Sequence, residues 1–250
     1  MRRLLITIRY DGTDYHGWQV QPNGVTVQEM VQDAVEKVFG ARIDVTGCSR
    51  TDSGVHANMF CFHMDTELDI PCEKVPLALN TALPDDIAVL FCKEVDGDFH
   101  ARYCAKGKRY VYRLYDSHLR DPFINRYSVQ YKGKLNVEAM NEAAQSFVGK
   151  HDFSAFCASG SEVEDRVRTV YEMRVERIGN EVAVTVSADG FLYNMVRIMA
   201  GTLMAVAEGK ISPDAIPDIL ASGDRSQAGI TAPACGLSLS RVVYSPEFCI

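Results

Sequence analysis

A short polar segment, Cys48-Ser49-Arg50-Thr51-Asp52-Ser53-Gly54-Val55-His56-Ala57, holds the residue types best suited to chemistry. It lies between two stretches, 42–47 and 58–65, that the residue pattern predicts as strands. Burying a carboxylate between strands is costly unless a neighbouring group stabilises its charge. Because Arg50 and Asp52 are two residues apart in an irregular segment, both can point into one cleft. We therefore interpret this segment as the active site, with Asp52 at its centre.

The carboxylate of Asp52 can act as a nucleophile or as a base. Both roles need its ionised form, and full burial raises the free pKa of about 3.9 by roughly 3–5 units. A neighbouring Arg lowers this pKa by about 1–3 units, which restores the charge. The chemistry therefore predicts an Arg partner for Asp52 in the folded protein.

A basic, tyrosine-rich segment spans residues 101–134. It contains nine Lys or Arg against two Asp, a formal charge of +7, whereas the whole chain carries −7. It also holds six of the eleven tyrosines. Because cations neutralise phosphates and aromatic rings stack on unpaired bases, this composition favours nucleic-acid binding. The alternative is a solvated strand with ordinary surface lysines.

Length and composition are those of a globular protein. The chain has 250 residues, 47% hydrophobic and 24% charged, enough for one large domain or two ordinary ones. No apolar run approaches the about 18 residues that suggest a membrane span. Met1-Arg2-Arg3 leads directly into an alternating strand and lacks the apolar core of a signal peptide. We therefore expect a cytoplasmic protein with no membrane partner.

Eight cysteines invite a disulfide or a metal site. No two are spaced as C-x-x-C, and none has a nearby His at zinc-finger spacing. Cys61 and Cys92 fall inside apolar strands, where a thiol packs as a small hydrophobe. The sequence therefore predicts buried, reduced cysteines and no metal. They lie at positions 48, 61, 72, 92, 104, 157, 235 and 249.

The elements that position Asp52 follow a βαββαβ order. The capping box Thr26-Val27-Gln28-Glu29 begins the first helix, and Gly40 ends it. In the second half, Gly179-Asn180 predicts a hairpin, and a short helix at 213–220 is an insertion. First-half strands are expected at 2–10, 42–47, 58–65 and 87–95, with helices at 26–39 and 73–82. Second-half strands are expected at 109–115, 168–178, 182–188 and 237–243, with helices at 137–148 and 191–208.

This order is the ferredoxin-like pattern, repeated once. We expect an α+β fold of two ferredoxin-like halves with mainly antiparallel sheets and an active-site cleft between them. The halves are expected as domains at 1–104, which carries the Asp motif, and at 105–250.

Five ordered motifs resemble those of the tRNA pseudouridine synthase A family. Residues 50–57 are similar to the family's signature, although Cys48-Ser49 and Ser53 depart from it in small residues beside the key ones. The other four motifs stand in the same order along the chain as in the family. They are 10–13 with 16–19, 99–102 with 108–112, 191–197, and 231–234 with Gly236-Leu237.

The resemblance implies an enzyme with the pseudouridine synthase fold, in which domain 105–250 carries the Tyr and Arg motifs. Such enzymes isomerise uridine to pseudouridine in the anticodon stem-loop of tRNA, around positions 38 to 40. They act as homodimers and need no metal or organic cofactor.

The resemblance also assigns roles to residues. It makes Asp52 the reacting residue, which either attacks the sugar, attacks the uracil or accepts a proton. It also makes Arg197 the charge partner of Asp52. Tyr110 would stack on the target uracil and take part in proton transfer. Arg50 would touch the RNA backbone or hold the flipped nucleotide. The substrate-binding set is Tyr110, Arg50, Lys108, Arg109 and Arg102.

Two other classes of protein fit parts of the sequence. A non-catalytic RNA-binding protein with RRM-like halves would also present aromatic residues on a sheet. This sequence, however, lacks the Gly-aromatic-Gly core of the RRM module. An RNA-binding module would also have no need for Arg50, Asp52 and Arg197. A hydrolase that pairs Asp52 with Asp11 or Asp14 would release free base or sugar.

Overall fold

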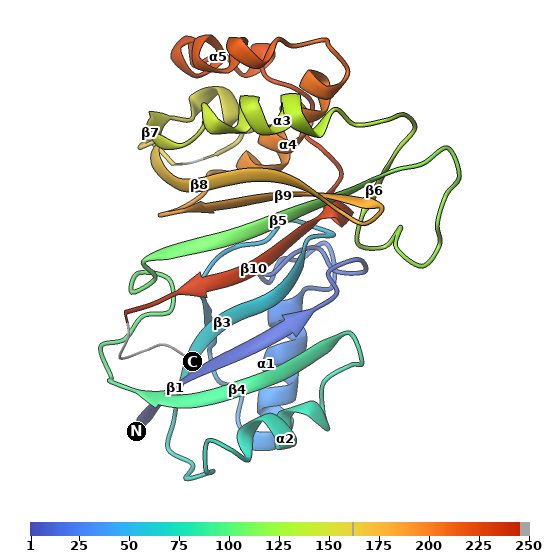
Figure 1. Ribbon diagram of the computed structural model, residues 1–250. Helices are drawn as coiled ribbons and strands as arrows, with labels where there is room; N and C mark the ends of the chain where they lie inside the picture. Colours follow the sequence, from blue (N-terminus) through green and yellow to red (C-terminus); the bar gives the residue numbers. More distant parts are fainter. Residues whose placement is uncertain (162, 246–250) are drawn as a thin grey trace. The chain divides into compact units, whose positions relative to one another are not determined.

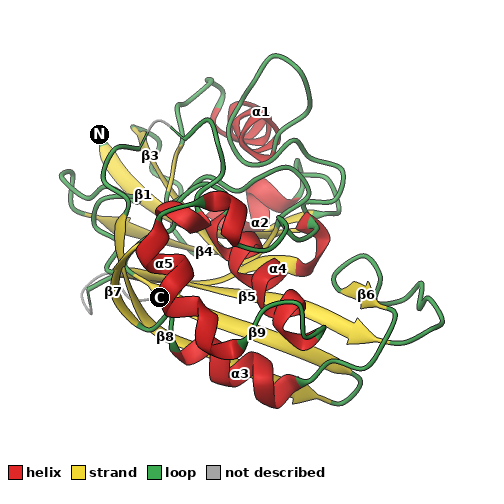
Figure 2. Cartoon of the chain, turned by 90° about the horizontal axis from the view of Figure 1, so that it is seen from above, coloured by secondary structure: helices red, strands yellow, loops and turns green. Residues whose placement is uncertain are grey.

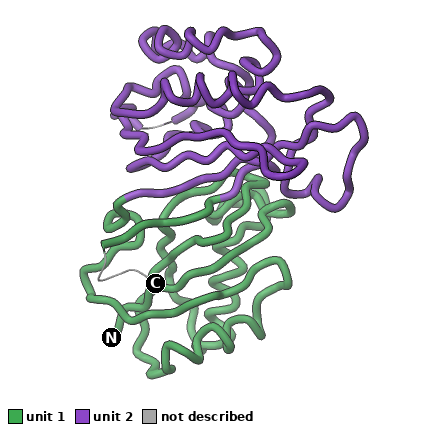
Figure 3. Tube along the Cα trace, viewed as in Figure 1, with its two compact units in different colours: residues 1–106, 239–250 green, residues 107–238 purple. Residues whose placement is uncertain are grey.

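Two compact units make up the chain in the computed structural model, which describes residues 1–161 and 163–245 (Figure 1). The first unit contains residues 1–106 and those from Leu239 onward, and the second contains residues 107–238 (Figure 3). Each combines a mainly antiparallel sheet with helices, so the α+β class is confirmed. The domain boundaries at 1–104 and 105–250 stay a prediction. In the structure the last strand groups with the first unit from Leu239 onward.

The strands of the first unit have the order β4-β1-β3-β10, and β2 pairs with β3. Cross-strand pairs such as Leu4 with Met64 and Ile6 with Phe62 fill its core. Two helices, α1 and α2, pack against each other on this unit (Figure 1). The elements are β1 (Arg2–Tyr10), α1 (Val27–Phe39), β2 (Thr46–Gly47), β3 (His56–Thr66), α2 (Val75–Asn80), β4 (Ile87–Val95) and β10 (Leu237–Val243).

Helix α1 forms as the sequence predicts. The side chain of Thr26 accepts a hydrogen bond from the backbone N–H of Glu29, and Gly40 ends the helix at φ 75°. The strand expected at 42–47 is wrong except for Thr46–Gly47. Arg42 is bound instead to Asp33 and Glu36 of α1, at 2.7 and 3.2 Å, which ties the start of this segment to the helix.

Helix α2 is shorter than the predicted 73–82. The side chain of Asn80 forms two hydrogen bonds to the backbone of Val89 on β4, at 2.7 and 3.0 Å. These bonds fasten the last turn of the helix to the sheet edge, and the helix ends there.

The strands of the second unit have the order β5-β9-β8-β7, and β6 runs parallel to β5. Helices α3, α4 and α5 lie on one side of this sheet (Figures 1 and 2). Its regular elements are β5 (Gly107–Asp116), β6 (Val129–Tyr131), α3 (Val137–Gln145), β7 (Gly149–Asp152), β8 (Val167–Ile178), β9 (Glu181–Ala188), α4 (Met195–Ala207) and α5 (Ile216–Ser222). Single-turn helices occupy 154–156, 213–215, 225–227 and 234–236.

Three details of this unit differ from expectation. Helix α3 ends at Gln145 rather than at 148, and Gly149, at φ 116°, begins strand β7 instead of following the helix directly. Helix α4 begins at Met195 rather than at 191, because Asn194 adopts a left-handed backbone conformation. Strands β6 and β7 are only three and four residues long, too short for an alternation pattern to reveal.

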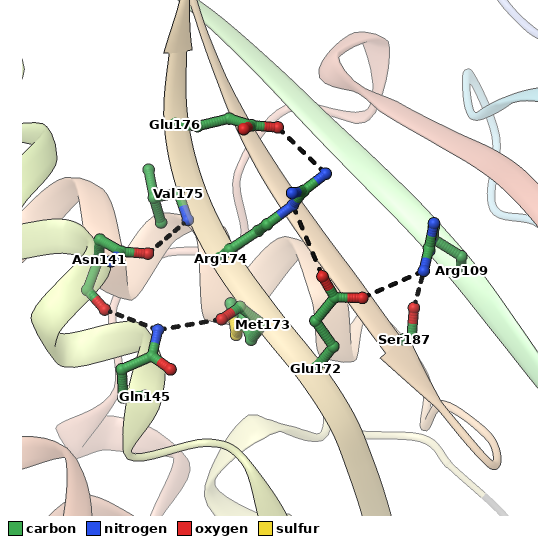
Figure 4. A network of polar contacts seen from close by, with 9 residues as sticks. All are labelled: Arg109, Asn141, Gln145, Glu172, Met173, Arg174, Val175, Glu176 and Ser187. Atoms are coloured by element: carbon green, nitrogen blue, oxygen red, sulfur yellow. Dashed lines mark hydrogen bonds and ion pairs between the residues drawn. The ribbon is translucent and has the colours of Figure 1, made fainter.

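The exposed edge of β8 is satisfied by side chains of α3. Strand β7 pairs only with residues 167–170 of β8. Further along, Asn141 accepts a hydrogen bond from the N–H of Val175 at 2.8 Å, and Gln145 donates one to the carbonyl of Met173 at 3.1 Å (Figure 4). The helix thus covers backbone groups that would otherwise be open to another strand.

Three of the cysteines, Cys48, Cys61 and Cys157, are buried as predicted. Positions 72, 92, 104 and 235 are half-buried, and position 249 lies outside the described residues. Within residues 1–161 and 163–245, no group of three or more His, Cys, Asp or Glu side chains is arranged to hold a metal ion. No helix in that part of the chain has the length and apolarity needed to cross a membrane.

The buried side chain of His63 makes the stability of the protein depend on pH. Its side chain is buried on β3, where its Nδ1 accepts a hydrogen bond from the N–H of Ala101 at 3.1 Å. Burial, aided by the charge of Arg3, lowers the pKa of His63 from 6.5 to about 4. Between these values the unfolded chain binds more protons than the folded one, so stability is full above pH 6.5 and falls toward pH 4.

We therefore expect His63→Gln, which keeps an acceptor for Ala101, to lose less stability between pH 6.5 and 4 than the wild type. Urea unfolding at several pH values measures this slope. His118→Gln, at an exposed position, is the matched control and should retain the wild-type slope. A His63→Gln slope equal to that of the wild type would contradict the prediction.

Candidate functional site

Asp52 lies in the loop that joins β2 to β3 in the first unit. The loop closes with a hydrogen bond from the N–H of Val55 to the carbonyl of Asp52 at 3.1 Å, followed by β3 from His56. Gly54 turns the chain at φ 77°. The side chain of Asp52 is half-buried and that of Arg50 is exposed. Arg50 and Asp52 therefore share one irregular loop, as the sequence predicts.

A second loop, residues 11–18, holds the Asp52 loop in place. The hydroxyl groups of Tyr10 and Thr51 are 2.9 Å apart. The N–H of Trp18 donates to the carbonyl of Thr51 at 3.2 Å, and the N–H of Gly54 donates to the carbonyl of Tyr15 at 3.2 Å. Sequence analysis matched this segment to a family motif but gave it no role. The structure makes it the support of the Asp52 loop.

The two loops approach so closely that side chains do not fit between them. A Cβ atom added to Gly12 would lie 2.0 Å from the carbonyl oxygen of Val55, and one added to Gly17 would lie 2.3 Å from that of Thr51. Gly17 also has φ 81°, which L-residues adopt only with strain. The two glycines are the sequence signal for this contact.

His56 and Asp11 complete the support. Nδ1 of His56 accepts a hydrogen bond from the N–H of Gly12 at 3.0 Å and lies 3.1 Å from Oδ1 of Asp11. The same carboxylate oxygen accepts from the N–H and the hydroxyl of Thr13, at 3.0 and 2.6 Å. Asp11 is therefore used to build its own loop, which disfavours the hydrolase in which it partners Asp52.

Arg197 lies in the first turn of α4, in the second unit, and is half-buried. Its Nε donates to the carbonyl of Ala232 at 2.8 Å, and one terminal nitrogen donates to Oδ1 of Asn194 at 2.8 Å. The N–H of Ala232 returns a bond to the carbonyl of Arg197 at 3.1 Å. These contacts fix the direction of the guanidinium group.

Asn194, at φ 59°, is the one residue other than glycine with a positive φ in the described part of the chain. This conformation costs of order 1–3 kcal/mol at a non-glycine residue and persists only where surrounding contacts hold it. Here it begins α4 and places Oδ1 beside Arg197. Asn194 falls inside the motif 191–197, but its role is not predicted from the sequence, because a left-handed Asn before a helix leaves no periodic pattern.

Tyr110 and Tyr112 share the face of β5 that α4 also contacts. Tyr112 is fully buried, its hydroxyl donates to the carbonyl of Pro233 at 2.8 Å, and burial raises its pKa. Tyr110 is 5% exposed, and its ring meets that of Phe191 edge-on, with centroids 5.0 Å apart. The segment 231–234 therefore contacts both the tyrosine strand and Arg197.

Arg109 lies on the other face of β5. It donates to the hydroxyl of Ser187 at 2.9 Å and to Glu172 at 3.1 Å (Figure 4). Glu172 in turn lies 3.6 Å from Arg174, which pairs with Glu176 at 3.3 Å. The charge of Arg109 thus belongs to a ladder of alternating charges, turned away from Tyr110.

The predicted site residues therefore form two groups. Arg50 and Asp52 share a loop of the first unit, and Tyr110 and Arg197 belong to the second, so the Asp52–Arg197 pair stays a prediction. Lys108 is half-buried, and Arg102 is exposed, with its guanidinium 6.0 Å from the ring of Tyr103. Substrate binding by Lys108, Arg109 and Arg102 also stays a prediction.

A family model described as tRNA pseudouridine synthase matches residues 6–104 and 143–245. The chain belongs to the tRNA pseudouridine synthase family. The resemblance inferred from the five motifs is thereby confirmed.

Known relatives agree over the full chain. A tRNA pseudouridine synthase A of Thermoanaerobacter sp. (strain X514) is 49% identical over 244 residues, which cover 98% of this chain and 100% of the relative. One of Ruminiclostridium cellulolyticum is 49% identical over 245 residues, with the same coverage. A solved H/ACA ribonucleoprotein, bound to a substrate RNA containing 2′-deoxyuridine, aligns with TM-score 0.37 and 14% identity over 98% of this chain and 50% of its own. This last likeness is weak, and the family assignment rests on sequence.

The contact between the two loops predicts that Gly12 tolerates no side chain. We expect Gly12→Ala to lower the free energy of unfolding by about 1–3 kcal/mol, because the added methyl group must push the backbone of the Asp52 loop away. Urea unfolding measures the change. Gly97→Ala is the control, since nothing lies within 4 Å of its added Cβ. Equal stability of the two variants would contradict the close contact.

Proposed function

We propose that this protein converts uridine to pseudouridine in the anticodon stem-loop of tRNA, at positions 38–40, with Asp52 as the nucleophile. As a member of its family it is an isomerase that acts on tRNA. The observation that carries the proposal is the anchored loop, which presents Asp52 beside Arg50 within the first matched segment. Family membership disfavours the alternative of a non-catalytic RNA-binding protein.

The reaction suits a carboxylate. The C1′–N1 bond of the nucleoside breaks, the uracil turns over, and a bond forms between C5 and C1′; the proton on C5 is lost and N1 gains one. Substrate and product are isomers, so the reaction consumes no second substrate and transfers no electrons to an acceptor. The proposal assigns the attack to the ionised carboxylate of Asp52, with Arg197 as the partner that keeps its pKa low.

The remaining residues handle the RNA. A uridine paired in a stem must be flipped out to be reached, at a cost of a few kcal/mol. In the proposal the exposed Arg50 contacts the RNA backbone or holds the flipped nucleotide, and Tyr110 stacks on the uracil and takes part in proton transfer. Lys108, Arg109 and Arg102 contribute positive charge toward phosphates. For Arg109 this means sharing its guanidinium with Glu172.

We also propose that the protein acts as a cytoplasmic homodimer without a metal or organic cofactor. The support for the dimer is the resemblance of the five motifs to a family of homodimers. Light scattering of the purified protein tests the oligomeric state, and activity in the presence of a chelator tests the independence from metal.

Asp52 is the residue on which the proposal stands. We expect Asp52→Ala to lower pseudouridine formation on unmodified tRNA by roughly 10²–10⁴-fold or more, since the reacting group is gone. The affinity for tRNA should stay close to that of the wild type. Measurement of pseudouridine at each anticodon-arm position, with no added metal, gives the rate and the site together.

The matched control for this experiment is Asp44→Ala, an exposed carboxylate outside both loops that should keep full activity. Wild-type protein that binds tRNA tightly but forms no pseudouridine would count against the proposed reaction. Release of free uracil would instead support the hydrolase alternative.

At Asn194 we expect a substitution to lower activity without lowering stability. Asn194→Gly removes the acceptor for Arg197, yet glycine adopts φ 59° without strain. We expect the variant to be as stable as the wild type or more so, with a kcat lower by roughly tenfold, about 1.4 kcal/mol of lost orientation. In an Arg197→Lys background the same substitution should change kcat little. Wild-type kcat in Asn194→Gly would show that the contact does not serve the reaction.

A further inference from the structure

The loop between β5 and β6, residues 117–127, turns large apolar side chains toward solvent. Leu119 is 80% exposed and Phe123 is 90% exposed. The loop extends beyond the end of β5 (Figures 1 and 2). It also falls between the two segments that the family model matches. Nothing assigned so far to the protein explains why an aromatic ring stands at this position.

The base of the loop is fastened to the second unit. The N–H of Ser117 donates to the carbonyl of Tyr131 on β6 at 3.0 Å, and the side chain of Gln130 donates back to the carbonyl of Ser117 at 2.9 Å. The start of the loop is therefore tied to β6, the strand that follows the loop.

The tip is ordered around the hydroxyl of Tyr115. This hydroxyl accepts from the N–H of Asp121 at 3.3 Å and lies 3.4 Å from Oδ1 of Asn125. Asp121 then accepts from the N–H of Asn125 through its carbonyl, at 3.0 Å, and from the N–H of Phe123 through its carboxylate, at 2.9 Å. The exposure of Phe123 is thus set by a hydrogen-bonded backbone, which lowers the entropy lost when a partner binds.

Two arginines flank Phe123 in the sequence. Arg120 and Arg126 are both exposed. The one acidic residue within 117–127 is Asp121, whose carboxylate already accepts a backbone hydrogen bond. The loop is therefore cationic in a chain whose net charge is −7.

We propose that loop 117–127 is an RNA-binding surface on which the ring of Phe123 stacks on an unpaired base of the substrate RNA. Leu119 packs beside that base, and Arg120 and Arg126 contact phosphates. This inference rests on the proposed function, because it takes the tRNA substrate as the ligand. An exposed aromatic ring flanked by cations and held on a rigid backbone is the composition that binds single-stranded nucleic acid. An apolar protein partner would not call for the flanking charge.

The test compares tRNA affinity among variants of the full-length protein. We expect Phe123→Ala to weaken binding by roughly 5- to 150-fold, the usual loss for one stacked base. Phe123→Trp should restore it, whereas Phe123→Leu, which keeps apolar surface without a ring for stacking, should not. Leu77→Ala is the control, since Leu77 is 71% exposed on α2 and should bind tRNA like the wild type. Since Phe123 is solvent-exposed, none of these changes threatens folding.

Two results would overturn the inference. One is a double variant, Phe123→Ala with Leu119→Ala, that binds tRNA with wild-type affinity. The other is a lower molecular mass of Phe123→Ala by light scattering with tRNA affinity unchanged, which would make a second copy of the chain the partner of this loop. Failure of the proposed function is a separate observation, namely a wild-type protein that binds tRNA without forming pseudouridine, because affinity and product are measured independently.

Discussion

The close approach of two loop backbones is the constraint on which the first unit's candidate site depends. Gly12 and Gly17 bring residues 11–18 against the carbonyls of Val55 and Thr51, closer than any side chain permits. The hydrogen bonds of Trp18 and Gly54 then run from backbone to backbone, and the side chains of Tyr10 and His56 add to this support. A carboxylate that must meet one carbon of its substrate gains from this kind of support.

In the second unit a strained backbone conformation at Asn194 plays the corresponding part. Asn194 adopts a left-handed backbone conformation at the start of α4, a helix whose other residues are mostly apolar and buried. The buried helix and the bond between Ala232 and Arg197 offset the cost of this conformation. In return the Asn194 side chain and the Ala232 carbonyl clamp a guanidinium group that would otherwise sample many rotamers. The packing of α4 thus stabilises a strained residue that orients the guanidinium group of Arg197.

Sequence reasoning reached the frame of the molecule because buried strands and helix faces have a period. Strands β1, β4 and β10 begin and end where their alternation predicts, and helix α1 has the caps that its sequence encodes. One failure shows why a local pattern is not enough. The segment 42–45 satisfies the pattern of a strand, yet Arg42 is paired to α1 by contacts that no local pattern records.

The same limit applies to the candidate site. The motif around Asp52 could be read from residue types, but its support by residues 11–18 depends on contacts between segments some 40 positions apart, such as that of Gly12 with His56. Alternation along β5 places Arg109 and Tyr110 on opposite faces. The partner of Arg109, however, is Glu172, two strands away, and it follows only from the register of β5 on β9 and of β9 on β8. Long-range register therefore decides whether a basic residue faces a phosphate unpaired or already holds a carboxylate.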